Sequence, residues 1–324
     1  MLKRRDLMLA SASLPLAMGP PVLPRAEEAQ SVGAWVARAP LPEPRFGLHA
    51  STVAGSIHVL GGDRNTAGTV PTGSHYVYDP VADRWSTAAD MPTPRGFFGT
   101  ATLDGRIYAV GGSINMQEQD PGIATVEIYD PRTGSWSRGM DLPTPRADLT
   151  MSEAGGKLYA IGGTRHVGIE ALGTVEVYDP QADHWTRMAD LPTRRLHLTS
   201  AALSGKIYVF GGGPEWPVPT AATEMYDPAT DSWTTMADMP TERTGVWAAS
   251  LNGRIYVLGG LGWESEALAT AEEFDPARNS WRRVADMPTA RFLLAAETVG
   301  GKVYAIGGAA TDFATQSAVE AFSL

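Results

Sequence analysis

The chain has 324 residues, a formal net charge of −10 and no cysteine. Because the acidic chain carries no basic stripe, neither nucleic acid nor an anionic membrane surface is expected as a partner. The lack of cysteine excludes disulfide bonds within the chain, thiolate nucleophiles and thiolate metal sites.

The first 29 residues have the layout of a bacterial export signal. A basic start, MLKRR, precedes the run LMLASASLPLAMG, which is too short and too interrupted for a membrane-spanning helix. The Arg4–Arg5 pair, one spacer and two apolar residues resemble the twin-arginine motif, and an ordinary secretory signal is the alternative. The sequence predicts a signal peptide over residues 1–29, no membrane span in the mature chain, and a periplasmic or secreted protein.

Residues 30–324 contain a repeat with a period close to fifty. Gly-Gly pairs recur every 48 to 51 residues, and they begin at Gly61, Gly111, Gly162, Gly211, Gly259 and Gly307. Seven residues before a proline in each unit stands a tryptophan, one of Trp35, Trp85, Trp136, Trp185, Trp233 and Trp281. Only the stretch between each Gly-Gly pair and the next Asp-Pro dipeptide changes in length. A repeat of this kind predicts one supersecondary unit per period, with one variable loop in each.

Each unit is predicted to form four β-strands, a to d in chain order. Segments such as GFFGTATL and RIYAV are typical of strands a and b, and dipeptides such as Asp104-Gly105 supply the positive φ angles of a two-residue turn between them. Strand c ends in the YDP pattern, and Asp83 or its equivalents tolerate the left-handed conformation before strand d. Because successive strands reverse direction, the variable b–c loops and the d–a connections share one face, called the loop face below. Binding residues favour loops held by a rigid scaffold, so this face is expected to be functional.

The tryptophan count predicts how the repeat closes. Trp35 precedes any complete unit, whereas the last unit ends at Phe322 without a tryptophan of its own. The N-terminal strand around Trp35 is therefore expected to complete the unit formed by residues 291–322.

The Gly-Gly pairs, the YDP segments, the spaced tryptophans and the Arg that opens strand a resemble the kelch repeat across residues 34–324. The resemblance implies an all-β fold, a six-bladed β-propeller with four strands per blade and an N-terminal strand closing the last blade. Kelch propellers include enzymes, periplasmic sugar-handling proteins and protein-binding adaptors. The resemblance therefore predicts the fold more sharply than the function.

An arginine follows the proline in every unit, and internal repetition favours a scaffold role because each blade has the same packing problem. The six are Arg45, Arg95, Arg146, Arg195, Arg243 and Arg291. Their expected partners are the strand-c glutamates Glu127, Glu176, Glu224, Glu272 and Glu320, and Tyr76 takes this position in the first blade. The alternative is a ring of free arginines that attracts anions.

Two positions after each arginine the residue type varies, and this series is expected at the mouth of the channel. It reads Gly47, Phe97, Asp148, His197, Gly245 and Leu293. Asp148 and His197 come from neighbouring blades and are the candidate catalytic residues, since a carboxylate that orients an imidazole is an acid–base arrangement. A structural hydrogen-bonded pair, or two solvated side chains, is the other interpretation.

The b–c loops supply the candidate ligand-binding residues, which are Arg64, Asn65, Arg165, His166, Glu215, Trp216, Trp263 and Glu264. Tryptophans beside charged groups suit a ligand with an apolar face and several hydroxyls, such as a sugar. The alternative is that they only cap the ends of the blades. We expect Asp148, Arg165, His166, His197, Glu215 and Trp216 to form one patch at the channel mouth.

Neither a metal nor a cofactor is expected, because the six histidines are scattered and no glycine-rich loop opens a helix. The first functional hypothesis is an exported module that binds a protein or glycan ligand through the loop face. The alternative is a periplasmic carbohydrate-modifying enzyme, since the architecture is similar to that of N-acetylneuraminate epimerase, although no catalytic motif carries over. A third is an accessory subunit whose partner holds the chemistry.

Overall fold

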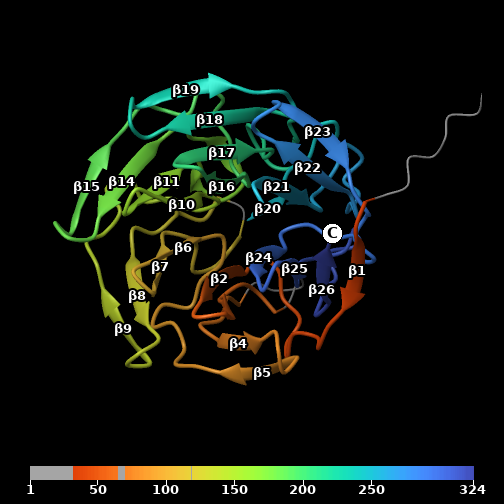
Figure 1. The fold of residues 1–324 in the computed structure, drawn as a ribbon. Helices are drawn as coiled ribbons and strands as arrows, with labels where there is room; N and C mark the ends of the chain where they lie inside the picture. The colour runs from red at the N-terminus through yellow and green to blue at the C-terminus, as the bar shows by residue number, and fades with distance from the viewer. Residues whose placement is uncertain (1–31, 65–69, 118) are drawn as a thin grey trace, which may run out of the picture. The chain divides into compact units, whose positions relative to one another are not determined.

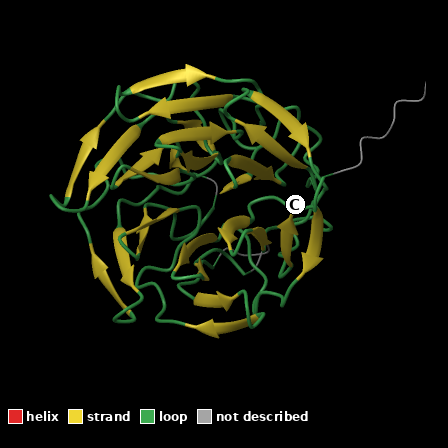
Figure 2. Ribbon diagram, viewed as in Figure 1, coloured by secondary structure: helices red, strands yellow, loops and turns green. Residues whose placement is uncertain are grey.

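The computed structural model describes residues 32–64, 70–117 and 119–324, so the predicted signal peptide lies outside the described residues. The described residues form one compact unit in which six four-stranded antiparallel sheets surround a central axis (Figure 1). The described residues contain β-strands and no helix (Figure 2). The predicted six-bladed propeller is confirmed.

The blades are numbered here in chain order, and strand a of each lies nearest the axis (Figure 1). Blade 1 contains β2 (His49–Val53), β3 (Ser56–Leu60), β4 (His75–Asp79) and β5 (Arg84–Thr87). Blade 2 contains β6 (Gly99–Leu103), β7 (Arg106–Val110), β8 (Val126–Asp130) and β9 (Ser135–Arg138). Blade 3 contains β10 (Thr150–Ala154), β11 (Lys157–Ile161), β14 (Val175–Asp179) and β15 (His184–Arg187).

Blade 4 contains β16 (Thr199–Leu203), β17 (Lys206–Phe210), β18 (Thr223–Asp227) and β19 (Ser232–Thr235). Blade 5 contains β20 (Trp247–Leu251), β21 (Arg254–Leu258), β22 (Ala271–Asp275) and β23 (Ser280–Arg283). Blade 6 contains β24 (Ala295–Val299), β25 (Lys302–Ile306), β26 (Val319–Ser323) and β1 (Ala34–Ala37). The b–c loop of blade 3 adds a short hairpin of β12 (Thr164–His166) and β13 (Ile169–Ala171).

The turns between strands have the backbone conformations that the sequence predicts. Asp104 and Gly105, between β6 and β7, have φ angles of 51° and 71°. Asp83, between β4 and β5, has a φ of 50°, and its carboxylate accepts a hydrogen bond from the Ala39 backbone N–H at 2.8 Å. The turn residue therefore also ties its blade to the preceding one.

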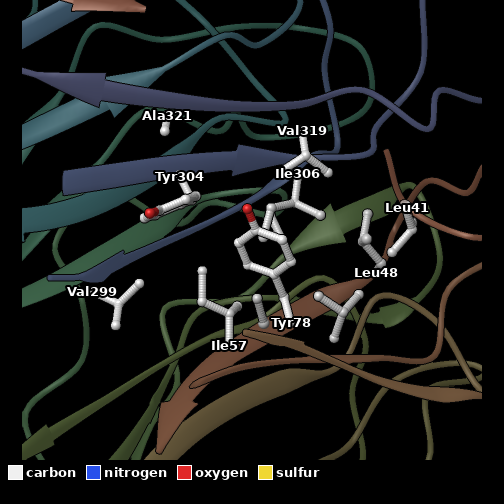
Figure 3. Close-up of a cluster of buried hydrophobic side chains, with 12 residues drawn as sticks. Leu41, Leu48, Ile57, Tyr78, Val299, Tyr304, Ile306, Val319 and Ala321 are labelled. Atoms are coloured by element: carbon white, nitrogen blue, oxygen red, sulfur yellow. The ribbon is translucent and has the colours of Figure 1, made fainter. Parts of the chain in front are cut away.

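The ring closes through β1, as expected from the position of Trp35. β1 pairs antiparallel with β26, with Trp35 opposite Phe322. At the seam, a buried cluster combines Ile57 and Tyr78 of blade 1 with Tyr304 and other side chains of blade 6 (Figure 3). Because the first and last segments of the propeller share one blade, β26 has a partner strand on both sides.

The repeated tryptophans link each blade to its neighbour. The Trp35 indole N–H donates to the Ala285 carbonyl at 2.7 Å, and the Trp85 indole N–H donates to the Ala39 carbonyl at 2.9 Å. The other four tryptophans make the same bond to the equivalent carbonyls of the preceding blades. Trp35 thus joins blade 6 to blade 5 in the same way that every other blade is joined.

All six repeated arginines have no solvent exposure, which confirms their scaffold role. In blade 2, the Arg95 guanidinium donates to Glu127 at 2.8 Å and to the Gly111 carbonyl at 3.0 Å. Thr93 donates to the other oxygen of the same carboxylate at 2.7 Å. Blades 3 to 6 repeat the arginine–glutamate pair. A charge buried in this way is tolerated because most of its hydrogen-bonding groups are matched.

Blade 1 keeps the arginine but takes its carboxylate from a different segment. Tyr76 replaces the strand-c glutamate, and the Arg45 guanidinium carbon lies 4.9 Å from the centroid of its ring. Glu43, which stands where the other blades have threonine, accepts from Arg45 at 3.0 Å. The negative charge has therefore moved from strand c to the d–a connection, and the buried cation still has a partner.

Deletion of residues 31–40 is expected to destabilise the whole ring, because it removes β1 and exposes the edge of β26. Thermal unfolding and light scattering of the deletion variant should show a lower melting temperature and aggregation relative to the parent. Removal of residues 1–29 alone is the control and should not change the melting temperature. A deletion variant that melts like the parent would show that β1 does not close the ring.

The Arg146→Ala substitution should lower the free energy of unfolding by about 3 kcal/mol, because it leaves the buried Glu176 carboxylate without its cation. The matched control is Arg187→Ala in the same blade, whose partner Asp190 and own side chain are both 52% exposed. The control should cost less than about 1 kcal/mol. Chemical denaturation measures both, and equal losses would contradict the scaffold role.

Candidate functional site

Six backbone hydrogen bonds form a closed ring at the loop-face end of the channel. The residues are those two positions after each arginine, and each donates its N–H to the carbonyl of the residue in the adjacent blade. The donor and acceptor pairs are Phe97 to Gly47, Asp148 to Phe97, His197 to Asp148, Gly245 to His197, Leu293 to Gly245 and Gly47 to Leu293, at 2.7 to 3.2 Å. The expectation that this series meets at the mouth is confirmed.

All six residues of this backbone ring have a positive φ, between 49° and 63°. Glycine adopts such angles freely, but Phe97, Asp148, His197 and Leu293 hold them at a cost in strain. Inward-facing N–H and C=O groups of consecutive blades thus satisfy one another, and the ring narrows the channel to a floor beneath the loops.

A cavity of about 490 Å³ lies on the loop face above this ring. Apolar side chains make most of its wall, and His197 is the polar side chain among them. The lining residues are Phe46, Phe97, Met116, Val167, Gly168, His197, Trp216, Pro217, Leu293 and Phe313. Five of the six blades contribute, and the loops of blades 2, 3, 4 and 6 form the sides.

Asp148 and His197 meet across the boundary between blades 3 and 4. Their Oδ1 and Nδ1 atoms lie 3.2 Å apart, although the contact lacks the alignment of a hydrogen bond. Burial raises the pKa of Asp148 to about 8, against a smaller opposing effect of the Gly168 backbone N–H, and burial lowers the pKa of His197 to about 3. Both groups therefore favour their neutral forms at neutral pH.

The two side chains differ in access to the large cavity. His197 lines it, whereas Asp148 lines a smaller cavity of about 40 Å³ beneath the backbone ring and its side chain has no solvent exposure. A neutral imidazole whose pKa is about 3 is a weak proton acceptor at neutral pH. The arrangement offers one hydrogen-bonding group at the floor of an apolar cavity.

Trp216 forms one side of the cavity. Its ring centroid lies 4.7 Å from that of His197 and 5.8 Å from that of Phe292. Its backbone N–H donates to the Gly168 carbonyl at 3.2 Å, so the b–c loops of blades 3 and 4 support each other. Of the six residues predicted to form one patch, His197 contacts both Asp148 and Trp216.

The other predicted ligand-binding residues do not line the cavity. Arg165, His166 and Glu215 belong to the neighbouring loops and are exposed. Further out, Arg64 pairs with Glu43 at 3.3 Å, the Trp263 indole N–H donates to Glu242, and Glu264 is exposed. Asn65 lies outside the described residues. The geometry thus separates two residues of the cavity wall, His197 and Trp216, from a charged periphery.

Apart from Trp216 and Trp263, the apolar side chains that the b–c loops expose around the cavity were not predicted from the sequence. The b–c loops of five blades each carry one that is at least 36% exposed, namely Val70, Ile114, Ile169, Trp263 and Phe313. Trp216 is the equivalent in blade 4 and is partly buried. A search of the variable loops for apolar residues, in addition to charged and polar ones, is the signal that would have found them.

Within residues 32–64, 70–117 and 119–324, no group of three or more His, Cys, Asp or Glu side chains is placed to hold a metal ion. The same ranges contain no helix that is long and apolar enough to cross a membrane.

His58 and His75 form a buried pair with ring nitrogens 2.8 Å apart, and burial lowers the pKa of each, to about 4 and about 3.

The comparisons with known proteins agree on the architecture. A family model described as the KLHDC2/KLHL20/DRC7 Kelch-repeats domain matches residues 28–212 and, in an overlapping match, residues 148–322. Kelch-like protein 40a of Danio rerio is 52% identical over 40 residues, which are 12% of this chain and 6% of that protein. The solved structure of YjhT superposes with a TM-score of 0.75 at 16% identity, covering 86% of this chain and 95% of that one, so this likeness shows the fold alone.

The Asp148→Asn substitution should raise stability most at high pH. The raised pKa of Asp148, about 8, means that the protonated carboxyl stabilises the fold below about pH 4 and that this contribution is lost as the pH rises to 8. Asparagine cannot ionise, so the melting temperature of the variant relative to the parent should increase between about pH 5 and pH 8. The exposed Asp141→Asn is the control. A melting-temperature difference between variant and parent that stays the same from pH 5 to pH 8 would contradict the raised pKa of Asp148.

Proposed function

The chain belongs to the kelch-repeat family, and we propose that it is a protein-interaction module that binds its partner through the loop face. In this proposal one apolar side chain of the partner enters the central cavity. The observation that carries it is the apolar wall of that cavity, which includes Phe46, Phe97, Met116, Trp216 and Phe313. A pocket of about 490 Å³ is in the size range of pockets that bind small organic groups.

The surroundings of the cavity support a protein partner. Exposed apolar side chains on the b–c loops encircle it, and Trp263 and Phe313 are 64% and 42% exposed. Charged residues such as Arg165 and Glu215 lie on the same loops. An apolar centre with aromatic anchors and a polar rim is the usual anatomy of a protein–protein interface.

A carbohydrate ligand fits this cavity less well. Sugars need several hydrogen-bonding groups, and among the described lining residues only His197 and the indole N–H of Trp216 supply polar side-chain atoms. The carbohydrate-modifying alternative further needs an acid–base pair that reaches the ligand, whereas the Asp148 side chain is covered. The binding module is therefore the better-supported function.

The site of action is also part of the proposal. The basic start with Arg4 and Arg5, followed by an apolar run, supports export by the twin-arginine route in a bacterium. The partner of the loop face would then be a periplasmic, secreted or cell-surface protein.

Selection of peptides from a phage-displayed random library tests the apolar anchor. Selected peptides should share one aromatic or long aliphatic residue, and its replacement by Ala should weaken binding by at least about tenfold. Phe313→Ser and Trp216→Ala in the protein should have similar effects, measured by fluorescence anisotropy of a labelled peptide.

Val81→Ser is the matched control, because Val81 is 94% exposed in the β4–β5 turn, away from the loop face. It should leave peptide binding unchanged. Peptides that bind Phe313→Ser and Trp216→Ala as tightly as the parent would overturn the proposal. So would a glycan that binds the parent and competes with every selected peptide.

A further inference from the structure

The channel contains a third cavity, on the opposite side of the backbone ring from the loops. Its volume is about 300 Å³, and it is lined by the middle residues of the innermost strands of all six blades. The lining residues are Ser51, Thr52, Thr100, Ala101, Thr102, Met151, Ser152, Glu153, Ser200, Ala201, Ala202, Ala248, Ala249, Ser250, Ala296, Glu297 and Thr298. We call it the hydroxyl cavity.

The hydroxyl cavity is lined mainly by polar side chains and alanines, whereas the cavity on the loop face is lined mainly by large apolar side chains. Eight of its lining residues are serines or threonines, two are glutamates, and none is Lys, Arg or His. Glu153 comes from blade 3 and Glu297 from blade 6, on opposite sides of the ring. The walls therefore combine many hydrogen-bonding hydroxyls with an uncompensated negative charge.

Neither carboxylate has a cationic partner among the described residues. Glu297 accepts a hydrogen bond from the Thr52 hydroxyl at 3.1 Å, and Glu153 accepts one from the Gly156 backbone N–H at 2.8 Å. Burial raises the pKa of Glu297 to about 7. A carboxyl in this state gains most from a ligand that brings a positive charge.

One hydroxyl at the cavity has unused hydrogen-bonding capacity. The Thr298 hydroxyl oxygen is buried and has no hydrogen-bond partner in the described protein. Because buried polar groups in folded proteins are almost always paired, this hydroxyl indicates a polar occupant of the cavity.

We propose that the hydroxyl cavity binds a small organic cation that carries hydroxyl groups. The ammonium group contacts Glu297, and the hydroxyls of the ligand pair with that of Thr298 and with other serine and threonine hydroxyls of the wall. A metal ion is a poorer match, since no group of three carboxylate or imidazole ligands occurs in the described chain. The site is independent of the loop face, because the backbone ring separates the two cavities.

Ligand-observed NMR titration at about pH 8, above the raised pKa of Glu297, tests the proposal. Glucamine is the probe, sorbitol is its neutral counterpart with a hydroxyl in place of the ammonium group, and putrescine is a cation without hydroxyls. Glucamine should bind at least about tenfold more tightly than sorbitol, as expected for one charge-assisted hydrogen bond. Putrescine should also bind more weakly than glucamine, because it leaves the hydroxyls unpaired.

Two variants assign the binding to this cavity. Glu297→Gln should reduce glucamine affinity by about tenfold while leaving sorbitol affinity unchanged. Ala202→Lys places a cation at a partly exposed position of the wall and should abolish glucamine binding. This variant tests the site even if Glu297→Gln fails to fold. Asp104→Asn, in an exposed a–b turn on the same side, is the matched control and should bind like the parent.

Equal affinities for glucamine and sorbitol would overturn the proposal, as would unchanged glucamine binding by both Glu297→Gln and Ala202→Lys. The absence of saturable glucamine binding would show that the cavity holds water only. Peptide binding at the loop face should be the same with and without glucamine, so failure of one proposal leaves the other standing.

Discussion

Six arginines with no solvent exposure hold the d–a connections in place, and these connections share the loop face with the b–c loops. Each comes from a d–a connection and donates to backbone carbonyls of its own blade and to a carboxylate, which belongs to strand c in blades 2 to 6 and to Glu43 in blade 1. A guanidinium buried alone would be costly, but here its terminal NH₂ groups meet carbonyl and carboxylate acceptors, while Nε has no partner in Arg45, Arg146, Arg243 and Arg291. The d–a connection is consequently held against the end of its blade, and the backbone ring follows two residues later.

The backbone ring explains why one scaffold holds two chemically different cavities. Its N–H and C=O groups satisfy each other around the axis, so the side chains above and below it are free to differ. Above it, the b–c loops supply aromatic and aliphatic side chains, including Trp216 and Phe313. Below it, strand a supplies hydroxyls and the carboxylates of Glu153 and Glu297. The two cavities therefore differ in the side-chain chemistry that a ligand would meet.

Blade 1 shows that the buried arginine needs a carboxylate partner but that this partner can come from different positions in the sequence. Tyr76 occupies the glutamate position, and Glu43 of the d–a connection supplies the carboxylate that Arg45 needs. The partner has come from a different segment, yet the arginine remains fully buried. The requirement is a negative group within reach of the guanidinium, whichever segment provides it.

The sequence by itself determined the blade count, the strand order, the closure through Trp35 and the arginine–glutamate pairing, because each depends on residue types repeated at constant spacing. It also placed Asp148 beside His197, since their positions in adjacent repeats are equivalent. Only the tertiary structure decided that Asp148 is covered, that Arg165 and Glu215 lie outside the cavity wall, and that apolar loop residues encircle it. Side-chain exposure in variable loops depends on contacts between blades, for example that of Trp216 with Gly168, and no periodic pattern encodes such contacts.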